Sequence, residues 1–411
     1  MTADPLHPLP AKALAQLHEA MEGHVAAGRM PGVATLVAWG DEVHVDTVGK
    51  AAFTDDAPLA RDAIFRIASL TKPIVAAAAL SLVEEGRLQL DGPIDDLVPE
   101  LADRRVLRSI DAELDDTVPA RRPVTLDDLL TSRLGFGSLM DAPGTYPIQR
   151  AEEAAHLQSI GGPPWPPGPH DVDSWVAALG ALPLMDQPGE RWLYGTSTQV
   201  LGIVVARAAG TDIGTVVRER ILDPLGMHDT GFWVPADRID RLTTLYMPEG
   251  ETDADELAVF DAPPASWWST PPRLPDTGGW MVGTIDDYWS FVAMLLAGGT
   301  SRDGTRVLSP ATVGRMTADQ LTAPQRDEVF GGYGSWGYGM LVPAAGAVDE
   351  PLPHGMGWDG GTGVTWRSNP WTGVSGILFT QRHVLSPTAN QVTSDFWDAL
   401  APLAPLKPHR R

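Results

Sequence analysis

The stretch that decides the interpretation of this chain is RIASLTKPIVAAAAL, residues 66–80. It places Ser69 three residues before Lys72, at the start of an alanine-rich run. Residues three apart share one face of a helix, so the hydroxyl and the amine can meet. Apolar neighbours desolvate the amine and lower its pKa, and either form activates a serine, since a neutral amine accepts a proton and an ammonium stabilises negative charge. The helix dipole at Ser69 favours an oxyanion. The pair fits an activated nucleophile, and the competing interpretation is an N-cap serine followed by an ordinary helix lysine.

Two later segments add to this pair. PGERWLYGTSTQVLGIVVARAAG (188–210) places Tyr194 just before an apolar helix, where a phenol can exchange a proton with Lys72 and Ser69. GMGWDGGTGVTW (355–366) has three glycines around Trp358 and Asp359, which leave backbone N–H groups free for a close-lying substrate. The competing interpretations are a half-buried tyrosine at a helix entrance and an ordinary glycine-rich turn.

Together these segments resemble the class C β-lactamase and penicillin-binding-protein superfamily of serine hydrolases, especially its carboxylesterase branch (family VIII). The three motifs are SLTK (69–72), YGT (194–196) and WDG (358–360), in the order that the family has them. Flanking segments such as FRIASLTKPI, LDGPIDDLVPEL, PGERWLY, ILDPLGMHDTGFW and GGWMVGTIDDYWSF also match, so the resemblance runs from about Pro31 to Gln381.

The resemblance implies a serine carboxylesterase-type hydrolase that works through an acyl-enzyme. By that resemblance Ser69 is the acylated nucleophile, Lys72 its proton partner, and Tyr194 the base that later activates water. The oxyanion hole would be formed by the N–H groups of Ser69 and Gly361. The expected substrate-binding residues are Trp358, Asp359, Gly360 and Thr196.

The chain departs from the β-lactamases at two positions. Trp358 stands where those enzymes have a lysine that holds the substrate carboxylate, and Thr196 replaces an asparagine. Loss of a cation that binds a carboxylate costs roughly a hundredfold in affinity, which favours neutral, apolar esters over β-lactams. The alternatives that stay open are an acyltransferase, a D-amino-acid peptidase or amidase, a weak β-lactamase, and a non-catalytic binding protein that keeps the fold.

Strand-forming segments lie at both ends of the chain and helices in the middle. This predicts an α/β (α+β) fold: an antiparallel sheet flanked by helices from residues 1–88 and 275–411, and a mainly helical lobe from 89–274, as in β-lactamases and transpeptidases. Within it we expect helices over 11–29, 70–85, 286–297 and 394–403, and hairpins over 30–51 and 363–382.

Composition restricts the class of partner. The net charge of -23 disfavours nucleic acid and anionic membranes, and the absence of cysteine excludes disulfides and thiolate metal sites. No metal-binding or nucleotide-binding motif is present, so we expect no cofactor and a small-molecule ester as the substrate. No export signal or long apolar run is seen, which predicts a cytoplasmic location; the oligomeric state is left open.

Tryptophan is abundant, with 14 residues. Several lie in expected loops or near the motifs, where they could line an acyl or alcohol pocket, and core packing is the alternative for each. These are Trp165, Trp192, Trp267, Trp268 and Trp358.

Overall fold

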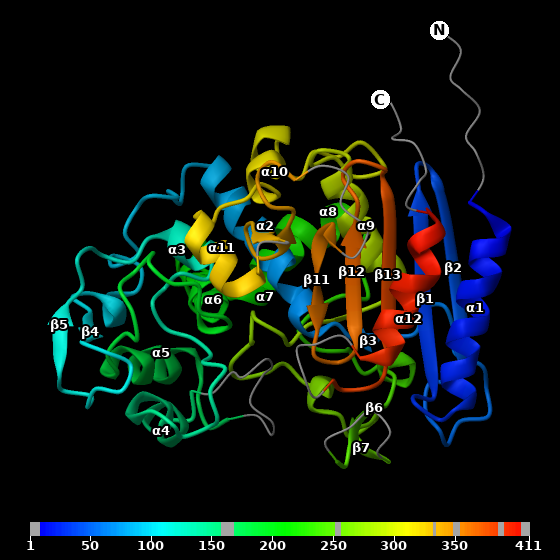
Figure 1. Cartoon of the computed structure of the whole chain (residues 1–411), viewed down its shortest axis with the longest axis horizontal. Coiled ribbons are helices and arrows are strands. Elements are labelled where there is room, and N and C mark those ends of the chain that lie inside the picture. The colour runs from blue at the N-terminus through cyan, green and yellow to red at the C-terminus, as the bar shows by residue number, and fades with distance from the viewer. Residues whose placement is uncertain are drawn as a thin grey trace, which may run out of the picture.

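A seven-stranded antiparallel sheet joins the two ends of the chain (Figure 1). The computed structural model describes residues 9–157, 168–250, 256–331, 334–347, 354–384 and 390–403. In spatial order the strands are β2-β1-β13-β12-β11-β10-β9, so the N-terminal hairpin pairs directly with the C-terminal strands. The predicted fold class is confirmed. The strands are β1 (Gly32–Trp39), β2 (Glu42–Gly49), β9 (Ser335–Trp336), β10 (Leu341–Val342), β11 (Met356–Gly360), β12 (Val364–Ser368) and β13 (Val374–Thr380).

Helices cover both faces of this sheet. α1 (Ala11–Ala26) and α12 (Gln391–Leu400) lie on one face, where Val33 and Val37 of β1 pack with Phe396. α9 (Ile285–Leu296) and α2 (Thr71–Glu84) lie on the other, in the core that holds Leu36 of β1 and Phe379 of β13. Because side chains alternate along a strand, β1 is buried over its whole length.

α2 is the central helix of the molecule. Every residue from Thr71 to Leu82 is buried, and small alanine side chains let neighbouring elements approach the helix closely. The expected helix over 70–85 is confirmed, and Gly86 follows it with a left-handed φ of +70°. The first helix ends at Ala26, earlier than predicted, and Gly28 after it has the same left-handed backbone, with φ +70°.

The middle of the chain is mostly helical, as expected, but it also holds two short hairpins that the sequence did not predict. Their strands have only three to five residues, too few for an alternating pattern to stand out. The domain boundaries at 88/89 and 274/275 stay a prediction. The hairpins are β4 (Arg105–Leu107) with β5 (Thr117–Pro119), and β6 (Leu245–Pro248) with β7 (Leu257–Asp261).

The remaining regular elements are short. β3 (Phe65–Arg66) pairs with β8 (Val282–Gly283) just before Ser69. In the described residues no single helix is long and apolar enough to cross a bilayer. By length and composition alone, the helices at Thr196–Ala209 and Ile213–Leu225, bent by 82° relative to each other, pass as a pair. The other helices are α3 (Leu126–Leu130), α4 (Pro147–Ala154), α5 (Val172–Ala181), α6 (Thr196–Ala209), α7 (Ile213–Val217), α8 (Asp223–Leu225), α10 (Pro310–Met316) and α11 (Ala323–Phe330).

Candidate active site

Ser69 lies in a tight turn that several neighbours hold in place. A 3-10 turn, η1 (Ala68–Leu70), precedes α2, so the helix begins at Thr71 rather than directly after Ser69. Thr71 Oγ1 donates to the Ala68 carbonyl at 2.7 Å and accepts from the Met281 N–H at 3.1 Å. Ala68 has φ +43°, a left-handed conformation that residues other than glycine rarely adopt. Such local strain persists only where the surroundings fix the backbone, and it concentrates at functional sites.

Lys72 contacts Ser69 from the first turn of α2. The lysine is 2% exposed, and its Nζ donates to Ser69 Oγ at 3.1 Å. The same Nζ donates to the Gly278 carbonyl at 2.5 Å and lies 4.2 Å from the centre of the Tyr194 ring. A hydroxyl, a carbonyl and an aromatic face therefore surround the amine, and it is buried as the sequence predicted.

Tyr194 approaches this pair with its ring rather than its hydroxyl. The hydroxyl accepts a hydrogen bond from the Trp358 indole N–H at 2.7 Å. Among the described residues it forms no hydrogen bond to Ser69 or Lys72. The Tyr194 carbonyl accepts from the Ser138 N–H at 2.9 Å, and Gly195, which follows at φ +98°, opens α6. The structure thus places the three side chains side by side, with Lys72 between the other two.

The end of β11 packs directly on the Ser69 turn. A Cβ on Gly360 would lie 3.0 Å from the Ala68 Cβ and from the Ile67 carbonyl oxygen, so a glycine is needed at this position. The turn that follows is closed by a bond from the Gly363 N–H to the Gly360 carbonyl at 3.0 Å, which does not use the N–H of Gly361. The Ser69 turn is likewise closed by a bond that does not use the Ser69 N–H: the Leu70 N–H donates to the Ile67 carbonyl at 3.0 Å.

Asp359 and Thr196, the two remaining predicted substrate contacts, occupy different positions. Asp359 follows Trp358 on β11, so its side chain points to the opposite face of the sheet. Its carboxylate accepts from Thr365 Oγ1 at 2.5 Å and pairs with Arg367 at 2.7 Å, and the structure does not bring it to Ser69. Thr196 is the first residue of α6 and is 2% exposed.

Aromatic rings surround Tyr194. Trp192 stacks on it at 5.5 Å between ring centres, and Trp358 lies at 5.7 Å. Trp336 packs edge-on against Trp358 at 4.6 Å, and Phe330 stacks on Trp336 at 6.4 Å. The sequence singled out Trp192 and Trp358, but Trp336 was missed, although its segment YGSWGYG has the same glycine-flanked pattern as the Trp358 segment.

The other tryptophans singled out from the sequence do not join this group. Trp268 is 1% exposed, stacks on Trp280 and lies under the guanidinium of Arg66. Trp267 packs edge-on against Phe260 at 5.5 Å. Trp165 lies outside the described residues.

A buried carboxylate near Lys72 was also missed. Asp276 is 8% exposed, and its Oδ1 accepts a hydrogen bond from the Gly278 N–H at 2.6 Å. The carbonyl of the same Gly278 accepts from Lys72. Burial raises the pKa of Asp276, and the charge of Lys72 opposes that rise. The only available indication in the sequence was an acidic residue directly before Thr-Gly-Gly in PDTGGWM.

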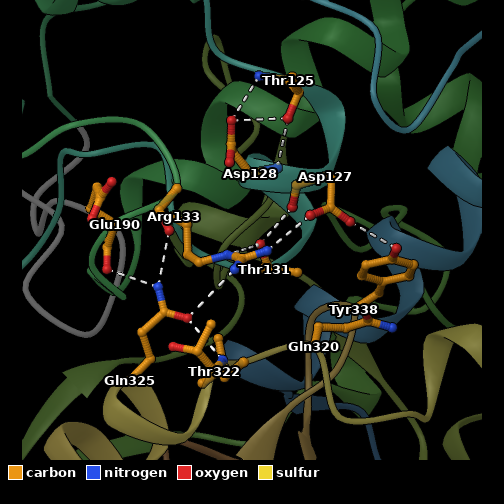
Figure 2. Close-up of polar contacts among 12 residues, drawn as sticks. Thr125, Asp127, Asp128, Thr131, Arg133, Glu190, Gln320, Thr322, Gln325 and Tyr338 are labelled. Carbon is orange, nitrogen blue, oxygen red and sulfur yellow. Dashed lines mark hydrogen bonds and ion pairs between the residues drawn. The ribbon is translucent and has the colours of Figure 1, made fainter. Parts of the chain in front are cut away.

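A polar network connects α3 with α11 and includes Glu190, four residues before Tyr194 (Figure 2). Asp127 accepts from the Tyr338 hydroxyl at 2.8 Å and pairs with Arg133 at 2.9 Å. Gln325 of α11 donates to the carbonyls of Gly189 and Glu190 at 2.9 and 2.8 Å. The Gln325 bonds join α11 to the segment that leads into Trp192 and Tyr194. The Arg133 carbonyl, which accepts the Gly189 N–H at 2.8 Å, joins the residues after α3 to the same segment. In the described part of the chain no group of three or more histidine, aspartate or glutamate residues is arranged to hold a metal ion.

Comparisons with known proteins agree with this architecture. The chain is 39% identical to Protein Rv1367c of Mycobacterium tuberculosis over 356 residues, 84% of each chain. It is 29% identical to Esterase EstB of Burkholderia gladioli over 373 residues, 86% of each chain. The solved structure of EstCE1, a hydrolase with promiscuous acyltransferase activity, superposes with a TM-score of 0.77 at 22% identity, covering 95% of this chain and 99% of that one.

The family model described as Beta-lactamase matches residues 17–393, nearly the whole chain. The curated relatives include an esterase and acyltransferases, in agreement with the resemblance drawn from the three motifs. The chain therefore belongs to the beta-lactamase family of serine hydrolases.

Proposed function

We propose that this protein hydrolyses carboxylic esters through an acyl-enzyme on Ser69. The observation that carries the proposal is the 3.1 Å bond between Lys72 Nζ and Ser69 Oγ, two residues that are 2% and 3% exposed. A buried amine bonded to a serine hydroxyl matches the arrangement by which enzymes activate a weak nucleophile.

The proposed reaction has two halves. Ser69 Oγ attacks the ester carbonyl and its proton is transferred to the Tyr194 oxygen, while Lys72, which contacts Ser69 Oγ and the Tyr194 ring, stabilises the negative charge on the attacking oxygen. The carbonyl oxygen becomes an oxyanion that accepts from the N–H groups of Ser69 and Gly361, and the alcohol leaves with the proton. Water then attacks the acyl-enzyme, giving its proton to Tyr194, and the acid is released as Ser69 regains a proton.

The surroundings favour a neutral, apolar ester as the substrate. Trp358 offers an indole where a cation would hold a carboxylate, and its N–H is already donated to the Tyr194 hydroxyl. Trp192 and Trp336 extend the apolar surface beside it. The net charge of -23 adds a long-range repulsion of anionic substrates.

Acyl transfer to an alcohol is the second candidate. It is favoured by EstCE1, which has this fold and is described as a hydrolase with promiscuous acyltransferase activity, and by a relative named Acyltransferase calJ, 25% identical over 395 residues. The two reactions share the acyl-enzyme and differ in whether water or an alcohol resolves it. Product analysis with p-nitrophenyl butyrate and an excess of 1-butanol separates them: butyric acid marks hydrolysis and butyl butyrate marks transfer.

The proposal is tested by replacing the nucleophile. Ser69→Ala is expected to abolish hydrolysis of short-chain p-nitrophenyl esters without changing the unfolding temperature. Ser81→Ala is the matched control, because Ser81 is also a buried serine of α2, and among the described residues its hydroxyl bonds to the Ala78 carbonyl of the same helix and to Arg220. Activity of Ser69→Ala within tenfold of the parent would remove Ser69 from the nucleophile role.

A further inference from the structure

Asp276 is a buried carboxylate that the reaction outlined above does not use. It lies in the loop before β8, and a Cβ built on Gly278 would be 3.0 Å from Asp276 Oδ1 and 3.6 Å from Lys72 Nζ. The carboxylate and the amine therefore lie on the same side of the Gly278 backbone. Two ionisable side chains of the described residues face Lys72 from different loops: Asp276, whose pKa the charge of Lys72 lowers, and Tyr194, whose ring lies under the amine.

The loop that carries Asp276 is fixed to the start of α6. The Thr277 N–H donates to Gln199 Oε1 at 2.9 Å, and Thr277 Oγ1 donates to the Thr198 carbonyl at 2.7 Å. Asp276 Oδ1 accepts the Gly278 N–H, and this contact helps to fix the plane of the peptide group next to the Lys72 contact. The Gly278 carbonyl then meets Lys72 at 2.5 Å. The carboxylate thus acts on Lys72 both through the backbone and through its charge.

The contacts of Lys72 suit a protonated amine. An ammonium has three N–H donors and no acceptor. Three acceptors surround Nζ: Ser69 Oγ, the Gly278 carbonyl and the face of the Tyr194 ring. A buried ammonium needs a compensating negative charge. Asp276 is the buried carboxyl on the same side of the Gly278 backbone, and the charge of Lys72 opposes the rise in its pKa that burial causes.

We propose that Asp276 is a positioning residue that holds the Gly278 carbonyl against Lys72 and, as the counter-charge, keeps Lys72 protonated during acylation of Ser69. This inference rests on the proposed function. It makes Lys72 the group that stabilises the negative charge developing on Ser69 Oγ, and leaves Tyr194 as the final proton acceptor.

The test is the pH dependence of kcat/KM for p-nitrophenyl butyrate in Asp276→Asn. The amide oxygen still accepts the Gly278 N–H, but the charge is gone, so Lys72 loses its proton at lower pH. The alkaline limb of the profile is expected to move about one pH unit toward neutrality. Asp276→Glu, which restores the charge, is expected to return the limb to within about 0.3 units of the parent.

Asp287→Asn is the matched control. Asp287 is also a carboxyl whose pKa is raised by burial, but its partners are Thr230 and the Asp229 N–H, in another part of the structure. Its substitution is expected to leave the alkaline limb in place, even where it lowers the unfolding temperature. Should Asp276→Asn not accumulate as a folded protein, Asp276→Ser is measured with the same criterion, since it keeps an oxygen acceptor without the charge.

An unmoved alkaline limb in Asp276→Asn, a limb moved to higher pH, or equal shifts in Asp276→Asn and Asp287→Asn would each overturn the inference. The rate at which a fluorophosphonate labels Ser69 should follow the same pH shift. Labelling also separates the two proposals. A parent enzyme that is not labelled at Ser69 defeats the proposed function, whereas a labelled parent with an unchanged Asp276→Asn profile defeats only the role of Asp276.

Discussion

Two buried pairs of a cation and a carboxylate lie on either side of Ser69, and they are built differently. Arg66, three residues before the serine, touches Asp261 directly, and the two side chains are 1% and 3% exposed. Lys72, three residues after it, reaches Asp276 only across the Gly278 peptide. In the Arg66–Asp261 pair the two charged groups touch each other directly. In the Lys72–Asp276 pair they do not, and Lys72 bonds to the Ser69 hydroxyl.

The difference separates a structural cation from a reactive one. The terminal nitrogens of Arg66 donate to the Thr243 carbonyl at 2.6 Å and to Asp261, and the guanidinium stacks over Trp268 at 4.7 Å. A planar guanidinium with these contacts stays charged and is fixed in position. The Arg66 carbonyl accepts from Thr362 Oγ1 at 2.6 Å, in the same turn as Gly361, so this pair supports the backbone on which we expect the oxyanion to form.

The largest effect is expected at Lys72. Lys72→Met keeps the buried volume but removes the amine, and kcat/KM for a p-nitrophenyl ester is expected to fall roughly ten-thousandfold, as for other members of a catalytic set. Asp276 keeps its backbone donors and can take up a proton, so the unfolding free energy should change less than in Arg66→Met below. An activity loss under tenfold would show that Lys72 resembles Arg66 in being structural.

Arg66→Met is expected to act on stability. It leaves Asp261 buried without its cation, which typically lowers the unfolding free energy by about 3 to 5 kcal/mol. Urea unfolding followed by tryptophan fluorescence measures the change, and the double variant Arg66→Met/Asp261→Leu should recover most of it. A single variant within about 1 kcal/mol of the parent would contradict the structural role.

Tyr194→Phe tests the role of the Tyr194 hydroxyl. It keeps the ring over the amine and removes only the hydroxyl, so turnover is expected to fall about a hundredfold, the contribution typical of a general base. The thermal unfolding midpoint should stay close to that of the parent, because the ring contacts with Trp192 and Trp358 remain. An unchanged kcat would assign the proton transfer to Lys72 alone.

The smallest effect is expected from Trp358→Phe. The variant keeps an aromatic ring against Trp336 and loses the N–H that is donated to the Tyr194 hydroxyl at 2.7 Å. One charge-stabilising hydrogen bond contributes about 1.5 kcal/mol, so kcat should fall about tenfold with KM little changed. A change in KM alone would make Trp358 a substrate contact without influence on Tyr194.

The sequence predicted those features that depend on short-range patterns. The three-residue spacing of Ser69 and Lys72 predicted that their side chains meet, and the apolar run after Lys72 predicted the buried helix α2. The strands at both chain ends correctly predicted a single antiparallel sheet. Strand alternation could also have shown that Trp358 and Asp359 face opposite sides of the sheet. The expected hairpin began only at residue 363, so these two residues were not assigned to a strand.

The features that were missed depend on long-range packing. Asp276 approaches Lys72 from more than two hundred residues away, and its position before Thr-Gly-Gly alone does not distinguish it from the many surface aspartates of this acidic chain. Trp336 did have a local indication, the glycines of YGSWGYG, but its contact with Trp358 is made by the short strand β9, which the sequence did not predict. The desolvation of Lys72 was inferred correctly from its neighbours, but the buried carboxylate that compensates for it comes from another part of the fold.

The most direct test of the central claim is covalent labelling. The enzyme is treated with a fluorophosphonate, its intact mass is measured, and the adduct is located by peptide mapping. The account predicts one phosphonyl group per chain, on Ser69, absent from Ser69→Ala and strongly slowed in Lys72→Met. An adduct on a different residue, or equal labelling of Ser69→Ala, would contradict it.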